Sequence, residues 1–410
     1  MGGLPDHLLT RWARTKLDLF DYTAAISLAD RSIQKNLNNA DSYYVRAVAH
    51  QHTGDFERAE DDFRKVLVFD PANGEVYERL ARMKRIRDQD IVEIKTKFTN
   101  DSIPAGSRTA FGYALATYYD QIADYAEASV WLRQANALKA VETPFSAPIH
   151  TGLVSRVISV FDRPFFESRD GEGSASDTAI FILGMPRSGT TLCETILAGY
   201  DEVFAGGERP DFQRLIKGLP DYPEMALAAE PDWARKNGEA ILTAMRDAAA
   251  GHPNITNKMP GNYICLGLVH WLMPNARLIH CRRDPRDNAL SCFQQHFRDG
   301  LSFTYDLDAF VVAYRQYRRI MAHWHEVLPG RILDVDYETL VSDPEHTAKE
   351  IVSFCGLEWS PSCLDTHKVD RAVNTASFFQ VRQPINTGSV GKWRKYESQF
   401  GSFFKALEAS

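Results

Sequence analysis

The stretch Ile180-Phe-Ile-Leu-Gly-Met-Pro-Arg-Ser-Gly-Thr-Thr-Leu192 decides the fold of the C-terminal part of this chain. An apolar run predicts a buried strand, which passes through a glycine-rich turn into the start of a helix. The backbone N–H groups of such a turn and a helix N-terminus form a site for an anion. The spacing from Gly184 to Gly189 is that of a nucleotide-binding P-loop, but Thr190 stands where an NTPase has lysine. Arg187 inside the turn instead offers a fork of donors to a phosphate or sulfate oxygen.

The run Pro186-Arg-Ser-Gly-Thr-Thr191 resembles the 5′-phosphosulfate loop of sulfotransferases that use 3′-phosphoadenosine 5′-phosphosulfate (PAPS). The resemblance covers the region from about 178 to 400. It implies a sulfuryl transfer to a hydroxyl acceptor, with adenosine 3′,5′-bisphosphate as the nucleotide product. It also implies that the loop binds the cofactor through Arg187, Ser188, Gly189, Thr190 and Thr191.

Strand and helix patterns alternate downstream of this loop, as a parallel sheet with crossover helices requires. We expect strands at 277–281 and 331–335, and helices at 192–200 and 346–355. This alternation, together with the resemblance, predicts a P-loop-like α/β sulfotransferase domain with a parallel sheet over 177–410.

The segment 278–291 resembles the 3′-phosphate site of sulfotransferases, in which an arginine at a strand end and a serine eight residues later bind the ribose 3′-phosphate. Arg283 and Ser291 occupy those positions here. A fork donor and a hydroxyl at a strand C-terminus suit a dianion. The alternative interpretation is a surface ion pair of Arg283 with Asp284 or Asp287.

Three further segments are similar to tyrosylprotein sulfotransferases and to bacterial proteins that fuse tetratricopeptide repeats to such a domain. They are Val203-Phe-Ala-Gly-Gly-Glu208, Thr256-Asn-Lys-Met-Pro260 and Ser377-Phe-Phe-Gln-Val-Arg-Gln-Pro384, the last with Lys392-Trp393 at the matching distance. The resemblance implies that Glu208 is the catalytic base and that Lys258 contacts the sulfuryl group. Ser377 and Lys392 are assigned to cofactor binding on the same ground.

One departure concerns the acceptor. The tyrosylprotein family has two acidic residues before its substrate-contacting threonine and arginine, and the run Gly207-Glu-Arg-Pro210 retains only the second. Protein tyrosine is therefore one candidate acceptor beside a peptide, a glycan or a small metabolite.

The chemistry of sulfuryl transfer requires a base within reach of the acceptor hydroxyl and cations near the leaving oxygen. Glu208 is the candidate base, and Lys258 and Arg187 are the candidate cations. His296 is the alternative base, because sulfotransferases of small molecules use a histidine. We expect no metal, since no histidine, cysteine and aspartate cluster has ligand spacing in the sequence. The other histidines of this region, at His270, His280, His323 and His325, are expected to be structural.

The first third of the chain is repetitive. Residues 40–71 form a nearly complete tetratricopeptide-like unit, and a shift of 34 positions places Asp21-Tyr22 on Asp55-Phe56. The pattern returns at 107–140. We expect a helical solenoid of about three to four helix pairs over 1–140, which commonly presents a protein-binding face. A connecting helix and linker follow over 141–176.

Composition limits the class of protein. The chain has 410 residues and a net charge of −7, which argues against non-specific nucleic-acid binding. No secretory signal and no run of 18 apolar residues stands in the sequence, so no membrane span is expected. Six cysteines in mostly apolar segments suggest reduced thiols in a cytoplasmic enzyme. Two hypotheses compete with a sulfotransferase: a P-loop nucleotide kinase-like phosphotransferase, and a repeat adaptor with an inactive sulfotransferase-like domain. The sequence leaves the oligomeric state open.

Overall fold

The structure is a computed structural model that describes residues 4–297, 300–366 and 384–409. The described residues fall into two compact units, one within Met1–Pro144 and Phe293–Arg298, the other within Phe145–Cys292 and Asp299–Ser410. The division at 140 and 176 that the sequence suggested stays a prediction.

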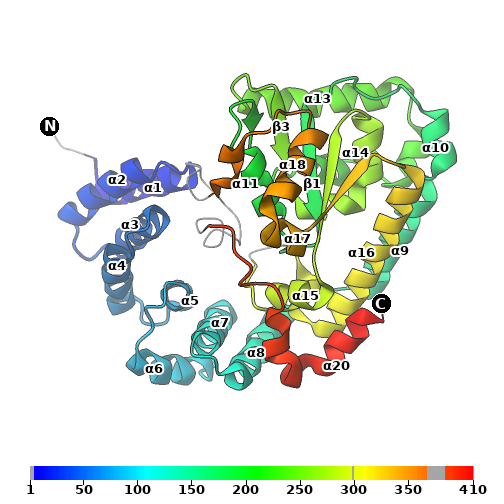
Figure 1. Ribbon diagram of the computed structural model, residues 1–410. Helices are drawn as coiled ribbons and strands as arrows, with labels where there is room; N and C mark the ends of the chain where they lie inside the picture. Colours follow the sequence, from blue (N-terminus) through cyan, green and yellow to red (C-terminus); the bar gives the residue numbers. More distant parts are fainter. Residues whose placement is uncertain (1–3, 298–299, 367–383, 410) are drawn as a thin grey trace. The chain divides into compact units, whose positions relative to one another are not determined.

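Helices make up the first unit in its described part (Figure 1). Most successive helices pack on each other, except that the helix at Gly74–Arg82 packs mainly on the helix at Ala105–Gln121. This packing and the repeat match at 40–73 confirm the predicted helical repeats. The helices are α1 (Asp6–Asp18), α2 (Tyr22–Lys35), α3 (Ala40–Thr53), α4 (Phe56–Phe69), α5 (Gly74–Arg82), α6 (Asp88–Phe98), α7 (Ala105–Gln121) and α8 (Tyr125–Glu142).

The turn between the two helices of a pair has a recurring chemistry. An aspartate caps the second helix by accepting a hydrogen bond from a backbone N–H three residues on. These caps are Asp21, Asp55 and Asp124. The residue before each cap has a left-handed backbone, with φ of 62° at Phe20, 85° at Gly54 and 61° at Ala123. The same turn geometry therefore repeats with three different residue types.

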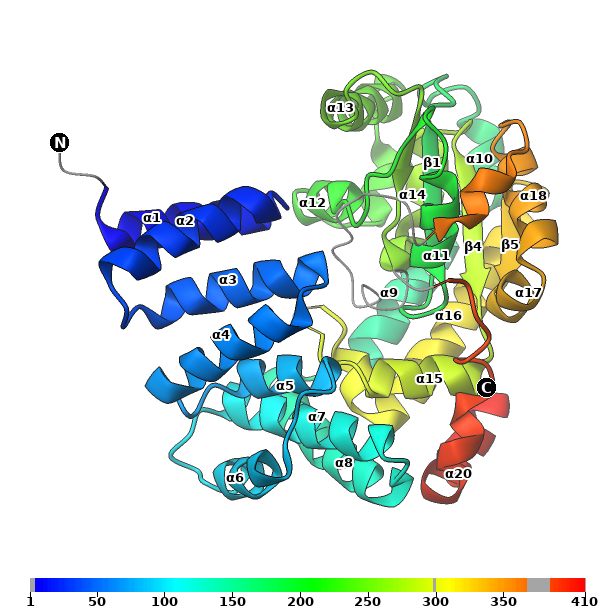
Figure 2. The ribbon, with the colours of Figure 1, turned by 60° about the vertical axis from the view of Figure 1, so that its left-hand side comes forward.

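The second unit is built on a five-stranded sheet in the order β2-β3-β1-β4-β5, and every described pairing in it is parallel. Figure 2 shows β1, β4 and β5 side by side. Strands β1, β4 and β5 match the predicted positions, and the prediction of a parallel α/β domain is confirmed. The strands are β1 (Ala179–Gly184), β2 (Val203–Phe204), β3 (Asn254–Asn257), β4 (Arg277–Arg282) and β5 (Ile332–Asp336).

Helices connect these strands and cover the sheet. Helix α9 lies along α16 in both views, and both belong to the second unit (Figures 1 and 2). The α-helices of this unit are α9 (Ala147–Val160), α10 (Arg163–Ser168), α11 (Thr190–Leu197), α12 (Asp211–Lys217), α13 (Asp232–Ala248), α14 (Leu266–Leu272), α15 (Pro285–Phe293), α16 (Leu307–Val327), α17 (Tyr337–Ser342), α18 (Pro344–Phe354) and α20 (Glu397–Glu408). Short 3-10 helices are η1 (Glu224–Ala228), η2 (Pro260–Cys265), η3 (Ser302–Tyr305), η4 (Pro361–Leu364) and η6 (Lys392–Tyr396).

Strand β1 lies at the centre of the sheet and is buried along its whole length. Ile180 and Ile182 face a core that α11, α17 and α18 complete, while Phe181 packs edge-on against Phe212 on the other side. Burial on both faces explains the continuous apolar run in the sequence. The carboxyl ends of the parallel strands meet at one edge of the sheet, where the candidate site lies.

The cysteines of the chain are all buried and free. Burial raises the pKa of the Cys265 and Cys292 thiols to about 12, which keeps them protonated and poorly nucleophilic. Across the described residues, every helix is too short or too polar to cross a lipid bilayer.

Candidate active site

The loop between β1 and α11 carries the strongest sequence motif, and its first residue lies close to the backbone of β4. Gly184 has a φ of 146°, and a Cβ there would lie 2.3 Å from the carbonyl oxygen of Cys281 on β4. Arg187 has a left-handed φ of 67°, which is uncommon for a residue with a side chain. Ser188 is buried, and its hydroxyl finds no hydrogen-bond partner among the described residues. This loop therefore holds an unused donor at the N-terminus of α11, where Thr190 and Thr191 begin the helix.

Arg187 and Ser291, predicted from separate motifs, meet in the structure. The Arg187 Nε donates to Ser291 Oγ at 3.1 Å, which joins the loop to α15. Asn288, one helical turn before Ser291, donates to the Pro186 carbonyl oxygen at 2.8 Å. Two contacts from α15 thus fix the loop, and the two predicted phosphate-binding segments form one surface.

Arg283 follows β4 directly and lies against the same loop. Its Nη1 donates to the Arg187 carbonyl oxygen at 3.0 Å and its Nη2 to the Ser389 carbonyl oxygen at 2.7 Å. The guanidinium carbon lies 4.5 Å from the centre of the Tyr337 ring, which suits a cation–π contact. Its Nε is buried without a partner in the described structure. The alternative interpretation from the sequence was a surface ion pair of Arg283 with Asp284 or Asp287. Among the described residues, neither aspartate forms an ion pair with Arg283.

Both aspartates have other partners. Asp284 pairs with Arg286 at 2.6 Å. Asp287 is buried and accepts backbone N–H bonds from Gly391 at 2.6 Å and Trp393 at 2.8 Å. Because these two N–H groups flank Lys392, Asp287 fixes the backbone of the turn that carries this lysine. Ser377 and most of the segment assigned to cofactor covering lie outside the described residues.

Glu208 and Lys258 form an ion pair, with Lys258 Nζ 2.6 Å from Glu208 Oε1. Lys258 directly follows β3, the neighbour of β1, and its side chain is 0% exposed, whereas that of Glu208 is 42% exposed. A fully buried lysine requires a paired anion, because an isolated charge is costly to bury. The Glu208 carboxylate therefore contacts the lysine on one side and is open to solvent on the other. A base needs such access to reach an incoming acceptor hydroxyl.

Glu194 holds the segment that carries Glu208, and sequence reasoning missed it. This buried carboxylate on α11 accepts from the Gly207 N–H at 2.9 Å and from Thr256 Oγ1 at 2.7 Å. Thr256 Oγ1 in turn accepts from the Gly206 N–H at 3.0 Å. The available signal was a lone carboxylate in the otherwise uncharged helix 190–197.

A polar network fixes the residues next to the ion pair. Arg209 donates to Asp211 at 2.8 Å, and Asn257 donates to the Arg209 carbonyl oxygen at 3.2 Å. Asn262 donates to Asn257 Oδ1 at 3.1 Å. The guanidinium that follows Glu208 is thus bound to a neighbouring carboxylate in this structure.

His296, the alternative base, belongs to the first unit together with residues 293–298. Its Nδ1 lies 2.8 Å from Glu78 Oε2, and its ring stacks on Tyr113 with centroids 4.8 Å apart. Burial opposes ionisation of Glu78, but the charge of Arg82 and the hydrogen bond from His296 prevail and lower the Glu78 pKa to about 2. His296 is thus held by a hydrogen bond and a ring contact within the first unit, and its role as the alternative base stays a prediction.

The other histidines have identifiable contacts. His323 Nε2 lies 2.9 Å from the Phe161 carbonyl oxygen, and His270 packs edge-on against Phe166. His280 and His325 gather around Asp334, and these three residues have donor atoms within 4.8 Å of one another. Sequence spacing did not predict this cluster, because it forms only when β4, β5 and α16 come together.

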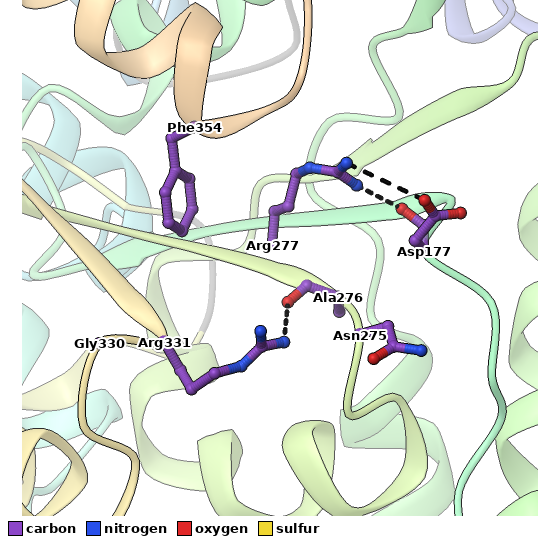
Figure 3. Close-up of a pocket in the computed structure, with 7 residues that line it drawn as sticks. All are labelled: Asp177, Asn275, Ala276, Arg277, Gly330, Arg331 and Phe354. Carbon is purple, nitrogen blue, oxygen red and sulfur yellow. Dashed lines mark hydrogen bonds and ion pairs between the residues drawn. The ribbon is translucent and has the colours of Figure 1, made fainter.

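A polar hollow of about 200 Å³ lies at the opposite, amino-terminal edge of the sheet (Figure 3). Arg277 points toward Asp177, and its Nη1 donates to the carbonyl oxygen of that residue at 2.8 Å. Arg331 donates to the Ala276 carbonyl oxygen at 3.4 Å. Both guanidinium groups thus donate to backbone carbonyl oxygens that line the hollow. The hollow lies away from the residues that the sequence motifs identified.

Residues 179–361 match the sulfotransferase family, and residues 40–73 match the tetratricopeptide repeat. The second unit contains a sulfotransferase-family domain. The family match spans the β1 loop, Glu208, Lys258, Arg283 and Ser291, so the predicted family is confirmed.

Several proteins resemble this chain over part or most of its length. An uncharacterized protein of Aquifex aeolicus (strain VF5) is 31% identical over 369 residues, which are 87% of this chain and 48% of that protein. A putative protein-tyrosine sulfotransferase of Caenorhabditis briggsae is 29% identical over 230 residues, 52% of this chain and 80% of its own. The solved sulfotransferase domain of the Synechococcus PCC 7002 olefin synthase superposes with a TM-score of 0.39 at 23% identity, covering 54% of this chain and 89% of that domain. The chain thus spans about half the length of the Aquifex relative.

Proposed function

We propose that this protein is a PAPS-dependent sulfotransferase that moves a sulfuryl group to a hydroxyl acceptor by in-line displacement. The main support for this proposal is that the predicted site residues lie together at one edge of the sheet. The β1 loop with Arg187 and Ser291 lies at the end of the central strand, and the buried Lys258–Glu208 pair follows the neighbouring strand β3.

The residues present fit the nucleotide. Ser188 Oγ and Arg283 Nε are buried polar groups without partners in the described structure, and both belong to segments assigned to phosphate binding. The tight backbone at Gly184 brings the loop N–H groups to the helix start, where an anion is favoured. Arg187, Ser188, Gly189, Thr190 and Thr191 would hold the 5′-phosphosulfate, and Arg283 with Ser291 the 3′-phosphate. Lys392 and Ser377 are assigned to the same cofactor.

PAPS supplies the activated sulfuryl group. The protein positions the acceptor and stabilises charge, since such a displacement needs little covalent work from side chains. Glu208 accepts the proton of the acceptor hydroxyl. Lys258 holds the Glu208 carboxylate in place through the ion pair and, with Arg187, provides positive charge where the leaving oxygen becomes negative. The proposed transfer uses no metal.

The acceptor belongs to the proposal as well. The named relative from Caenorhabditis briggsae makes protein tyrosine the first acceptor to test. We infer that the repeats help to bind a protein or peptide acceptor, because tetratricopeptide repeats commonly bind proteins. The free buried thiols support a cytoplasmic location.

A phosphotransferase would need an acidic magnesium ligand at a strand end. Asp336 ends β5, but its two carboxylate oxygens accept from Arg282 Nε and Nη2 at 2.8 Å each. Nothing in the described site therefore favours the kinase alternative. The adaptor alternative predicts nucleotide binding without turnover.

Ligand-induced thermal stabilisation tests the cofactor assignment. A ligand that binds only the folded state raises the melting temperature by mass action. Adenosine 3′,5′-bisphosphate should raise it far more than adenosine 5′-monophosphate or ATP with magnesium. Equal shifts from the first two nucleotides would remove the 3′-phosphate site, and a larger shift from ATP with magnesium would favour a kinase.

A further inference from the structure

We propose that His280, His325 and Asp334 form a Zn²⁺ site in the second unit, separate from the sulfuryl-transfer site. His280 lies on β4 and Asp334 is its direct cross-strand partner on β5. His325 comes from the last turn of α16. The site would tie a helix to the two strands beside it.

The donor atoms have spacings that suit a tetrahedral ion. His280 Nδ1 lies 2.7 Å from Asp334 Oδ1, and His325 Nε2 lies 3.3 Å from the same oxygen. All three donor atoms lie within 4.8 Å of one another. Zinc–nitrogen bonds of about 2.0–2.1 Å place tetrahedral donors roughly 3.3 Å apart, so small side-chain rotations suffice.

The surrounding groups can orient these ligands. His280 Nε2 contacts the Tyr317 hydroxyl, so the imidazole can bind metal through Nδ1 while its other ring nitrogen donates to tyrosine. Arg282 Nη1 donates to Asp334 Oδ2 at 2.9 Å and leaves Oδ1 toward the histidines. Partners of this kind fix ligand tautomer and direction in metal sites.

Charge and access also favour a cation. Arg282 is the cation that contacts the cluster in the described structure, and it is shared between the carboxylates of Asp334 and Asp336. With neutral imidazoles, these groups carry a net charge of about −1. His280 is buried, whereas the His325 side chain is 40% exposed, so an ion and a water as fourth ligand can enter from that side. Two imidazoles and one carboxylate are a ligand set that zinc accepts.

Zinc binding to the full-length protein tests the site without reference to activity. After removal of metal, zinc alone is titrated in a calorimeter, and melting temperature is measured with and without it. We expect one tight equivalent per chain and a zinc-dependent rise in melting temperature. Cobalt in place of zinc should give the visible absorption of tetrahedral Co²⁺.

His325→Ala is the informative variant, because the exposed ring can be removed without opening the core. It should weaken zinc binding at least about 10- to 100-fold, as loss of supporting groups already does in other sites. His346→Ala is the matched control, since that histidine is exposed on α18 and 3.6 Å from Glu350. The control should bind zinc like the unchanged protein. The proposal is overturned if the unchanged protein shows no zinc-dependent shift, or if His325→Ala binds zinc equally well.

Discussion

Glu194 lies under the segment that carries Glu208, and its carboxylate accepts from the Gly207 N–H and from Thr256 Oγ1. Removing it leaves the buried N–H without a partner and loosens the proposed base. Glu194→Ala should lower kcat by roughly 10- to 100-fold, the effect expected of a misplaced group, with little change in adenosine 3′,5′-bisphosphate affinity. Glu194→Gln keeps an acceptor oxygen and should recover most of the rate. Steady-state kinetics and nucleotide titration check this; equal losses in both variants would contradict the positioning role.

Lys258 is fully buried against Glu208, so its charge serves both the base and the proposed sulfuryl group. Lys258→Met keeps the methylene packing and removes the charge. We expect kcat to fall and adenosine 3′,5′-bisphosphate affinity to drop by about 1.5–3 kcal/mol, the size of a charge-assisted hydrogen bond. Calorimetric titration of the nucleotide measures the second effect. Unchanged affinity together with unchanged kcat would remove Lys258 from the site.

At the scale of elements, one helix-pair turn of the first unit has backbone strain that a single substitution should relieve. Ala123 has a φ of 61° where the equivalent turn in an earlier repeat has Gly54. A left-handed backbone costs an L-residue about 1 kcal/mol or more relative to glycine. Ala123→Gly should therefore raise the free energy of unfolding of this unit by about 0.5–1 kcal/mol. Denaturant unfolding followed by circular dichroism measures the change.

The matched control uses the same substitution in regular helix. Ala137 is exposed in the middle of α8, where glycine lowers stability by about 1 kcal/mol. Ala137→Gly should thus change the unfolding free energy in the opposite direction to Ala123→Gly. A loss of stability in both variants would show that the turn is not strained.

The elements differ in how far the sequence reveals them. Strands β1, β4 and β5 follow from apolar runs, and the repeated Asp21 and Asp55 predict the helix pairs. Strand β3 was not predicted as a strand, because Asn254-Ile-Thr-Asn257 is polar and only four residues long. Its polar side chains are satisfied by partners far along the chain, such as Glu194, and a single-sequence pattern does not show such pairs.

On the scale of the whole molecule, buried histidines link folding to pH. Burial, with a smaller contribution from the charge of Arg331, lowers the pKa of His270 from 6.5 to about 4. Between these values the unfolded chain binds a proton that the folded chain does not, so stability falls as pH falls. From pH 7 to 5 this residue should account for about 2 kcal/mol of lost stability.

His270→Phe removes this titration while keeping a ring against Phe166. Its unfolding free energy should decline less between pH 7 and 5 than that of the unchanged protein. Denaturant unfolding at both pH values gives the comparison. Parallel declines in the two proteins would contradict the assignment, because the other histidines are common to both.

The candidate site was partly predictable from the sequence for a topological reason. Arg187, Lys258 and Arg283 each follow a strand of one parallel sheet, so their motifs place them at one edge. The Arg187–Ser291 contact and the hydrogen bond from the Gly207 N–H to Glu194 could be recognised only in the structure, since neither follows from local spacing. The metal expectation was formed from spacing alone, and the fold assembles His280, His325 and Asp334 from distant segments.

The most direct test of the central claim is transfer of labelled sulfate from PAPS by the unchanged protein and by Glu208→Gln, on an acceptor identified from a cell lysate. The unchanged protein should transfer sulfate. The variant should bind adenosine 3′,5′-bisphosphate with similar affinity but transfer roughly 10²- to 10⁴-fold more slowly, because it lacks the base. Absence of any transfer by the unchanged protein would contradict the proposed function, and an undiminished rate in Glu208→Gln would contradict the catalytic assignment.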